Sequence, residues 1–329
     1  MNRLRAYRHI EDINQERLGE ILGVSTPMVG AMESGRRRMT ADLALIGYDE
    51  KRLNLPDMSE PLHRHRAGTA ASSKKRAHEL MRLAGEVFAE LRDVTPKAPT
   101  LTLERLPSPE SLADLEDIAI EVRCMLGHEE SGSIQNLTTA VERAGVCLVP
   151  IAGLQGIDGI SAWVGDVPVI GMSPNVPGDR FRLTLGHELG HLLFHRKKTD
   201  SSESEANRFA GALLFPLAEF EAALPARPNL RDFIALKSSW GVSVAAMVYR
   251  AHELGHMTDQ RYRSLQIQMS KWRKTEPGKF DASHGTLIER LVEVNGGAHE
   301  VSKHLGINHD HLQILTNWSR PHLRLAASG

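Results

Sequence analysis

Two histidines separated by three residues are the part of this sequence best suited to metal chemistry. The motif is His187-Glu188-Leu189-Gly190-His191, in a run expected to be helical. Residues four apart share one face of a helix, so His187 and His191 can bind the same metal ion. Glu188 lies about 100° round the helix, where its carboxylate can take a proton from water on the metal. The spacing predicts a Zn²⁺-dependent hydrolase with His187 and His191 as ligands and Glu188 as general base.

A catalytic zinc of this kind needs a third protein ligand and an open position for water. Two acidic residues, Glu203 and Glu205, begin the next expected helix. Glu203 shares a stripe with small residues, which with Gly190 opposite would let the two helices approach closely. Glu205 is rotated about 200° from Glu203, so only one of the pair can face the metal. We predict Glu203 as the third ligand, with Asn207, one turn on, orienting it.

His195 lies one turn beyond His191 and has three interpretations. It could be a third ligand, a group that supports the ligands, or simply a polar helix end. We favour the polar helix end.

The same five-letter motif, HELGH, occurs again at residues 252–256. There the apolar pattern ends near Gly255, which predicts the end of a helix, and Thr258 predicts the start of another. His256 is then expected in a turn, off the face of His252. We interpret the second copy as a coincidence of composition, because the chain contains 16 histidines.

Alternating helices and short strands are expected to surround the first motif. Gly165-Asp166 predicts a hairpin turn, and Pro168 indicates that the hairpin holds an edge strand. The expected strands lie near 146–150, 159–164 and 167–172, and the expected helices near 110–126, 133–144, 179–197, 203–215 and 243–254.

The stretch FRLTLGHELGHLLFH followed by ESEANRFAGALLFP resembles the ImmA/IrrE family of zinc metallopeptidases. The resemblance covers about 110–275 and includes GISAWVGDVPVIGM before the motif. It implies a zincin-like fold in which His187 and His191 bind zinc, Glu188 is the base and Glu203 is the third ligand. It also implies a protein substrate of the helix-turn-helix repressor class. The edge of the 159–172 hairpin could bind that substrate as an added strand.

The segment from Asn14 to Arg37 resembles the helix-turn-helix of XRE-type regulators. Its expected small core consists of Leu18, Leu22, Val24, Val29 and Met32. The resemblance implies a phosphate contact at Gln15 and base-edge contacts from Thr26, Pro27, Met28 and Ala31. Three successive arginines, Arg36, Arg37 and Arg38, would neutralise phosphates. Double-stranded DNA is the expected partner, and a fold used for protein contact is the alternative.

The amino-acid composition limits the partners, the disulfide content and the cellular location that we expect. The 329 residues carry a formal net charge of -1, so attraction to nucleic acid must come from a local patch. Two cysteines exclude a disulfide scaffold. The start lacks the apolar core of a signal peptide and no apolar run is long enough for a bilayer, so we expect a cytoplasmic protein without membrane contact.

We expect an α+β multidomain chain. Its segments are an all-α helix-turn-helix domain (1–55), a linker with an amphipathic helix (56–109), a metallopeptidase domain with a small sheet (110–275), and a helical C-terminal region (276–329) that weakly resembles a helix-turn-helix. The helix near 74–91 is expected to pack on its own chain, with dimerisation, and hence a possible homodimer, as the alternative. His304, His309 and His311 in the last region are expected to face solvent.

Two functions fit these observations. The first is a zinc endopeptidase joined to a DNA-binding module. The second is a transcriptional regulator whose peptidase-like domain is a sensor or interaction platform without significant proteolysis.

Overall fold

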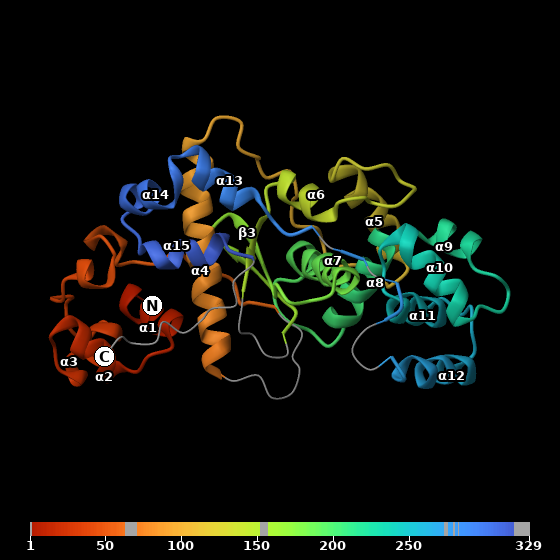
Figure 1. Cartoon of the computed structure of the whole chain (residues 1–329), viewed down its shortest axis with the longest axis horizontal. Coiled ribbons are helices and arrows are strands. Elements are labelled where there is room, and N and C mark those ends of the chain that lie inside the picture. Colours follow the sequence, from red (N-terminus) through yellow and green to blue (C-terminus); the bar gives the residue numbers. More distant parts are fainter. Residues whose placement is uncertain are drawn as a thin grey trace. The chain divides into compact units, whose positions relative to one another are not determined.

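The chain folds as two units, each assembled from separate stretches of sequence (Figure 1). The computed structural model describes residues 2–62, 71–151, 157–272, 276–278, 280–281 and 283–318. Unit 1 comprises Met1–Thr100, Val146–Pro174 and Gly285–Gly329, and unit 2 comprises Leu101–Gly145 and Asn175–His284. The segments expected at 56–109 and 110–275 therefore each contribute residues to both units. The architecture is α+β and mostly helical, as expected.

A three-stranded sheet lies in unit 1. Its strands are β1 (Cys147–Pro150), β2 (Gly159–Val164) and β3 (Val167–Met172), in the order β1-β3-β2. The central strand, β3, is parallel to β1 and antiparallel to β2. The predicted hairpin turn is present, with Gly165 at φ +58°. The hairpin does hold an edge strand, β2. Pro168 itself lies on central β3 but precedes Val169, the first residue paired with β1, so its missing N–H costs no bond on that side.

The outer edge of β2 is covered by the chain's own residues 57–62. Met58 bridges to Val164, and Leu62 bridges to Ser161. The Leu62 amide donates to the Ser161 carbonyl at 2.9 Å, and the Ser161 amide donates back at 3.0 Å. The expectation that a substrate adds to this edge is therefore wrong for this structure, because a preceding segment already satisfies the backbone groups there.

Long helix α4 (Ala71–Val94) packs on the sheet (Figure 1). The stripe predicted for it is buried inside unit 1, which confirms packing on its own chain. Gly85 is required at the contact with β2, because a Cβ there would lie 2.5 Å from the Val164 Cβ. The buried stripe consists of Ala77, Leu80, Met81, Ala84, Val87, Phe88 and Leu91.

The other helices of unit 1 come from both ends of the sequence. The first set is α1 (Arg3–Glu11), α2 (Gln15–Leu22), α3 (Thr26–Glu33) and the short 3-10 helices η1 (Leu43–Ile46) and η2 (Glu50–Arg52). The second set is α13 (Leu287–Val294), α14 (Gly297–Leu305) and α15 (His309–Thr316).

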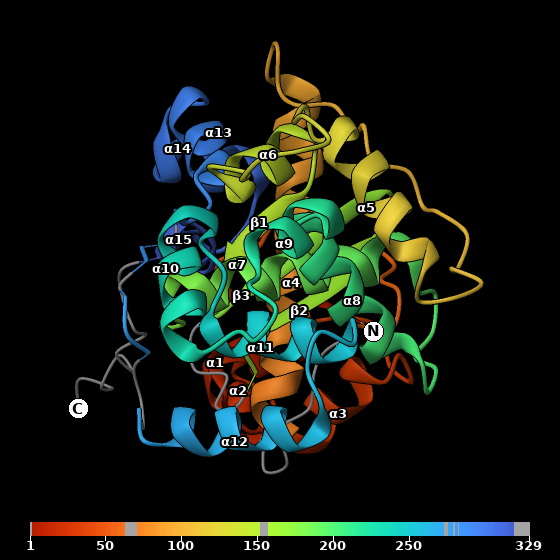
Figure 2. The same ribbon diagram turned by 90° about the vertical axis from the view of Figure 1, so that its right-hand side faces the viewer.

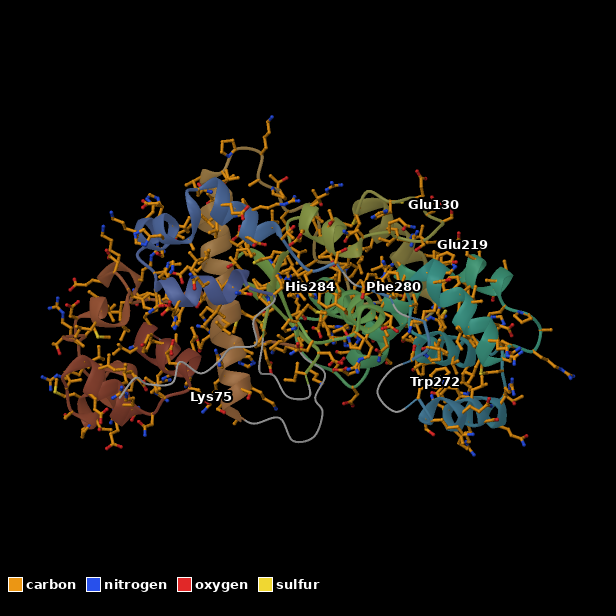
Figure 3. All side chains as sticks on the ribbon, viewed as in Figure 1. Lys75, Glu130, Glu219, Trp272, Phe280 and His284 are labelled. Carbon is orange, nitrogen blue, oxygen red and sulfur yellow. The ribbon has the colours of Figure 1, made fainter. Side chains whose placement is uncertain are left out.

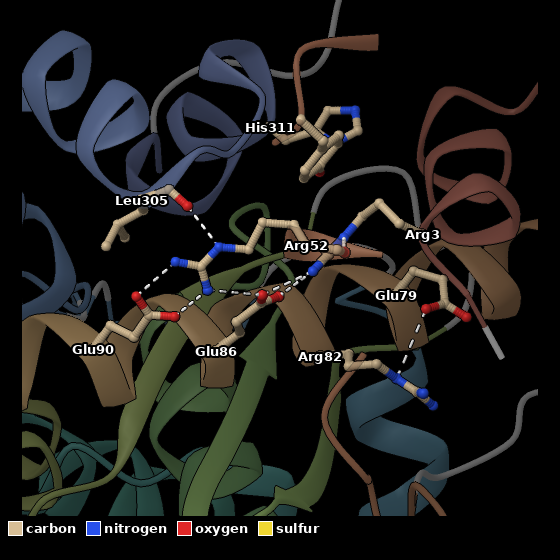
Figure 4. A network of polar contacts seen from close by, with 9 residues as sticks. Arg3, Arg52, Glu79, Arg82, Glu86, Glu90, Leu305 and His311 are labelled. Atoms are coloured by element: carbon tan, nitrogen blue, oxygen red, sulfur yellow. Dashed lines mark hydrogen bonds and ion pairs between the residues drawn. The ribbon is translucent and has the colours of Figure 1, made fainter. Parts of the chain in front are cut away.

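Ion pairs join the first set to α4, and a hydrogen bond joins the first set to the second (Figure 4). Arg3, which is 1% exposed, contacts Glu86 at 2.6 Å. Arg52 pairs with Glu90 and donates to the Leu305 carbonyl at 2.6 Å. The C-terminal helices therefore belong to the same unit as the N-terminal ones.

The regular secondary structure of the described residues of unit 2 is all helical (Figure 2). Helices α9 and α10 were not expected from the sequence, and of α12 only the start, at Thr258, was predicted. None of the helices in the described part of the chain combines the length and apolar character that a bilayer crossing requires. The helices are α5 (Asp114–Met125), α6 (Leu137–Arg143), α7 (Gly178–Phe194), α8 (Ser202–Leu214), α9 (Leu217–Ala223), α10 (Leu230–Trp240), α11 (Val244–Glu253) and α12 (Asp259–Ser270).

Candidate metal centre

Helices α7 and α8 carry the candidate metal ligands, and small residues let the two helices pack closely. A Cβ added at Gly186 would lie 3.3 Å from the Ala210 Cβ. A Cβ at Gly190 would lie 3.0 Å from the Phe209 ring and 3.4 Å from the Ala206 Cα. The sequence predicted this close approach, and it brings the first turn of α8 beside the last turns of α7.

The site formed there contains His187, His191 and Glu203, whose ligand atoms all lie within 4.8 Å of one another. The two histidine Nε2 atoms are 3.0 Å apart. The Glu203 carboxylate lies 3.6 Å from the Nε2 of His187 and 3.9 Å from that of His191. Tetrahedral zinc with ligand bonds of about 2.1 Å separates its ligand atoms by about 3.4 Å. The three side chains thus fit a zinc ion with little adjustment.

Asn207 supports His187 rather than Glu203. The Nδ1 of His187 lies 3.0 Å from the Asn207 Oδ1. An amide oxygen only accepts, so His187 carries its hydrogen on Nδ1, and its Nε2 lone pair faces the site. The expectation that Asn207 orients Glu203 is wrong, because one turn of helix α8 places the amide over the first histidine of α7. Glu203 instead accepts from the Lys198 ammonium at 3.0 Å.

His195 ends α7, as expected, but its side chain does not face solvent. The side chain is 3% exposed, with its Nε2 2.7 Å from the Glu205 carboxylate. Its Nδ1 lies 2.8 Å from the Nδ1 of His191. The interpretation as a simple polar helix end is therefore wrong, and the second of the three alternatives, a group that supports a ligand, describes the observed position. Glu205 turns away from the ligand set, as predicted, and contacts His195.

Glu188 is 1% exposed on α7, beside the two histidines in sequence. Such burial in a helix that carries two metal-type ligands suits a carboxylate whose task is proton transfer.

A buried arginine anchors the first half of α7, and no sequence pattern predicted its contacts. Arg182 donates to the carbonyls of Ile134 and Gln135 at 2.7 and 3.1 Å. Its guanidinium lies over the Phe280 ring, and His284, labelled with Phe280 in Figure 3, packs against Phe181. Burial lowers the pKa of Arg182 to about 10.

The second HELGH segment does not form a metal site among the described residues. His252 contacts Asp259 at 2.8 Å, and this hydrogen bond lowers the pKa of Asp259. His256 follows the end of α11 and contacts Glu221 at 3.3 Å. Glu253 pairs with Arg208 at 3.1 Å, within a buried network that includes Glu116. The predicted helix start at Thr258 is confirmed, since its side chain caps α12.

Two short helices occupy the N-terminal segment where DNA contacts are predicted. A turn with Gly23 at φ +64° joins α2 to α3. Thr26 and Pro27 begin α3 and are exposed, whereas Met28 and Ala31 are partly buried.

The Gln15 amide donates to Glu33 at 2.9 Å and retains a second N–H for a phosphate. Hydrogen bonds from Arg8 and Gln15 hold the pKa of Glu33 below its usual value, against the effect of burial. The predicted phosphate contacts Arg36, Arg37 and Arg38 are exposed.

His311 departs from the solvent-facing position expected for the C-terminal histidines. It is fully buried, with Nδ1 2.7 Å from the Tyr48 hydroxyl and Nε2 2.7 Å from Glu11. The sequence pattern placed it on a polar face, but contacts with Tyr48, between η1 and η2, and with Glu11 of α1 bury it.

Comparison with known families supports the resemblance at the centre of the chain. Residues 142–252 match the family model Peptidase_M78, described as the IrrE N-terminal-like domain. This stretch is similar to a metallopeptidase domain. The match includes the three strands, α7 and α8, and peptidases of this family are typically zinc-dependent. A search of curated proteins finds no match to the chain.

Proposed function

We propose that the chain is a zinc-dependent endopeptidase that acts on a protein substrate. The observation that supports this function best is the convergence of two Nε2 atoms and one carboxylate at a single point between α7 and α8. The family match over residues 142–252 supports the same chemistry.

In this proposal His187, His191 and Glu203 hold the ion, and Asn207 keeps the Nε2 lone pair of His187 directed at it. Bound zinc acidifies water and polarises the scissile carbonyl. Glu188 takes up the proton that the water releases and delivers it to the leaving amine nitrogen. Burial of the histidines keeps bulk water from competing for their ring nitrogens.

The substrate class follows from the resemblance, which points to helix-turn-helix repressors. The test incubates the wild type and Glu188→Gln with a panel of such repressors, with the zinc content of both proteins measured. We expect equal zinc content and a cleavage rate that is about 10²–10⁴-fold lower in the variant. Identical fragments from both proteins, or none from any repressor, would remove the support for proteolysis. Zinc uptake without cleavage would favour the alternative of a sensor or interaction platform.

A second proposed function is DNA binding in the cytoplasm by the N-terminal segment. The exposed start of α3 and the three exposed arginines after it support this function, since arginines on one surface neutralise phosphates. The partner would be double-stranded operator DNA.

A further inference from the structure

We propose that His195 and Glu205 form a positioning pair that fixes the tautomer and orientation of His191 for metal binding. This inference rests on the proposed zinc site. It concerns a histidine and a glutamate outside the ligand set, and it assigns neither of them a contact with the ion.

The two ring nitrogens of His195 are both engaged. Its Nδ1 lies 2.8 Å from the Nδ1 of His191, and its Nε2 lies 2.7 Å from the Glu205 carboxylate. Both side chains are shielded, with 3% of His195 and 14% of Glu205 exposed. Hydrogen bonds at such distances are held firmly where water cannot compete.

When His191 is a metal ligand, the hydrogen bonds from His191 through His195 to Glu205 can have only one donor-to-acceptor direction. A ligating Nε2 carries no hydrogen, so neutral His191 must carry its hydrogen on Nδ1 and donate it. The Nδ1 of His195 must then accept, which places the hydrogen of neutral His195 on Nε2. That hydrogen is donated to a carboxylate oxygen of Glu205, which accepts it. In the series His191, His195 and Glu205, each donor thus faces an acceptor.

The hydrogen bonds of His195 also distinguish it from the metal ligands. Among the described residues, the group that could hold a metal contains His187, His191 and Glu203, without His195. A ligand role would require His195 to release either His191 or Glu205. The arrangement instead matches the general pattern in which a metal-bound histidine donates its other ring hydrogen to a fixed acceptor. Here the acceptor is the imidazole of His195, which in turn donates a hydrogen bond to the Glu205 carboxylate.

The two candidate zinc histidines therefore have unequal support. His187 donates to the neutral amide of Asn207, whereas His191 is connected through His195 to an anionic carboxylate. Because this series of hydrogen bonds ends at the Glu205 carboxylate, the His191 imidazole becomes a stronger electron donor to the metal.

The test measures the zinc affinity of the full chain by competition with a chelator. We expect His195→Phe to weaken zinc binding about 10–100-fold, the usual cost of losing a partner behind a metal ligand. The matched control is His256→Phe, because His256 also lies beside a glutamate, Glu221 at 3.3 Å, but contacts no candidate ligand. That control should retain the wild-type affinity. Glu205→Gln keeps a hydrogen-bond acceptor but removes the charge, so it should also weaken binding, by less than His195→Phe, and it serves if His195→Phe fails to fold.

A spectroscopic measurement distinguishes positioning from a merely structural role. In the Co²⁺-loaded protein, His195→Phe should shift the visible ligand-field bands while keeping the intensity of a site with the same number of ligands. Wild-type zinc affinity and a wild-type Co²⁺ spectrum in both His195→Phe and Glu205→Gln would overturn the positioning pair alone. Loss of Co²⁺ band intensity that indicates a changed ligand number would also overturn it, in favour of a ligand role for His195. A wild-type chain that takes up neither metal would overturn the proposed zinc site itself.

Discussion

His187, His191 and Glu203 show how little of a metal site is visible in the spacing of its residues. The i, i+4 rule predicted that both histidines share a face, and the structure places their Nε2 atoms 3.0 Å apart. The residues behind them were assigned less well. Asn207 supports a histidine instead of the glutamate, and His195 is buried at a helix end where polarity alone suggested exposure.

Zinc binding at the site that contains Glu203 should stabilise the folded protein. The second HELGH segment should make no contribution to this stabilisation. At a free zinc concentration of 100 times the Kd, binding adds about 2.7 kcal/mol to the free energy of unfolding. We expect thermal unfolding of the wild type to shift upward with zinc and to return with a chelator. Glu203→Gln should lose most of that shift. His252→Gln should keep it, and an equal loss in His252→Gln would contradict the assignment.

His311 should make the chain less stable in mild acid. Burial lowers its pKa, although the Glu11 carboxylate opposes the shift. The unfolded chain therefore binds a proton near the ordinary value of about 6.5, where the folded chain does not, so stability falls as the pH drops below that value. The slope from this one group is at most about 1.4 kcal/mol per pH unit.

Urea unfolding of the wild type and His311→Gln between pH 7.5 and 5, a range chosen to span the ordinary histidine pKa of about 6.5, measures that effect. At pH 7 the variant should lose about 1–3 kcal/mol, because Tyr48 and Glu11 lose their partner. Its pH slope should also be smaller than that of the wild type. His78, whose pKa burial also lowers, contributes equally to both proteins and cancels in the comparison. An identical slope in both would show that His311 does not titrate as inferred.

At the scale of elements, the packing of α7 on α8 determines whether the ligands meet. Glu203 comes from α8 and both histidines from α7, so the interhelical distance sets the size of the site. That distance depends on Gly186 and Gly190, against which Ala210 and Phe209 pack.

Gly190→Val should separate the two helices. A Cβ at this position would already lie 3.0 Å from the Phe209 ring, and the larger side chain would force the helices apart. We expect a loss of about 1–3 kcal/mol in unfolding free energy together with weaker zinc binding. Gly211→Ala is the control on α8, because the added Cβ would contact the Arg250 side chain at 3.4 Å and no residue of α7. Equal zinc affinity in wild type and Gly190→Val would contradict the proposed dependence.

Local sequence patterns predicted the elements that have a clear hydrophobic periodicity or that end at characteristic turn and capping residues. The strands, the hairpin at Gly165, and helices α4, α7, α8 and α11 were all expected within a few residues of their bounds. Helices α9 and α10 were missed, and of α12 only the start, at Thr258, was predicted. Pairing of residues 57–62 with β2 was not predictable either, because it depends on a partner about 100 residues away in sequence and not on local propensity.

At the scale of the whole molecule, a formal net charge of -1 conceals an uneven distribution. Exposed Arg36, Arg37 and Arg38 form the local basic patch that the sequence required of any nucleic-acid contact. Many charged side chains elsewhere are internal: Arg3, Glu116 and Arg208, for example, are buried in ion pairs and offer nothing to a distant polyanion.

Neutralising the patch should reduce the salt dependence of DNA binding. Each phosphate contact contributes about -0.9 to the slope of log K against log salt concentration, so changing Arg36, Arg37 and Arg38 together to Gln should reduce the slope by up to about 3. Fluorescence anisotropy with duplex DNA over a salt series measures this slope. Arg231→Gln, on α10 of unit 2, is a control for loss of charge alone. An unchanged slope in the triple variant would contradict the phosphate role.

The discontinuous sequence of unit 1 has a consequence for synthesis on the ribosome. All of the residues of unit 2 have been translated by His284, but α13, α14 and α15 follow that point. Helices α13 and α15 contact β1 and α4, so the packing around the sheet of unit 1 can be completed only after α15 has been translated. Domains usually complete their folding in the order of translation. Unit 1, which contains the helices proposed to bind DNA, can therefore be completed only after the residues of the candidate metal site, all of which lie in unit 2, are available to fold.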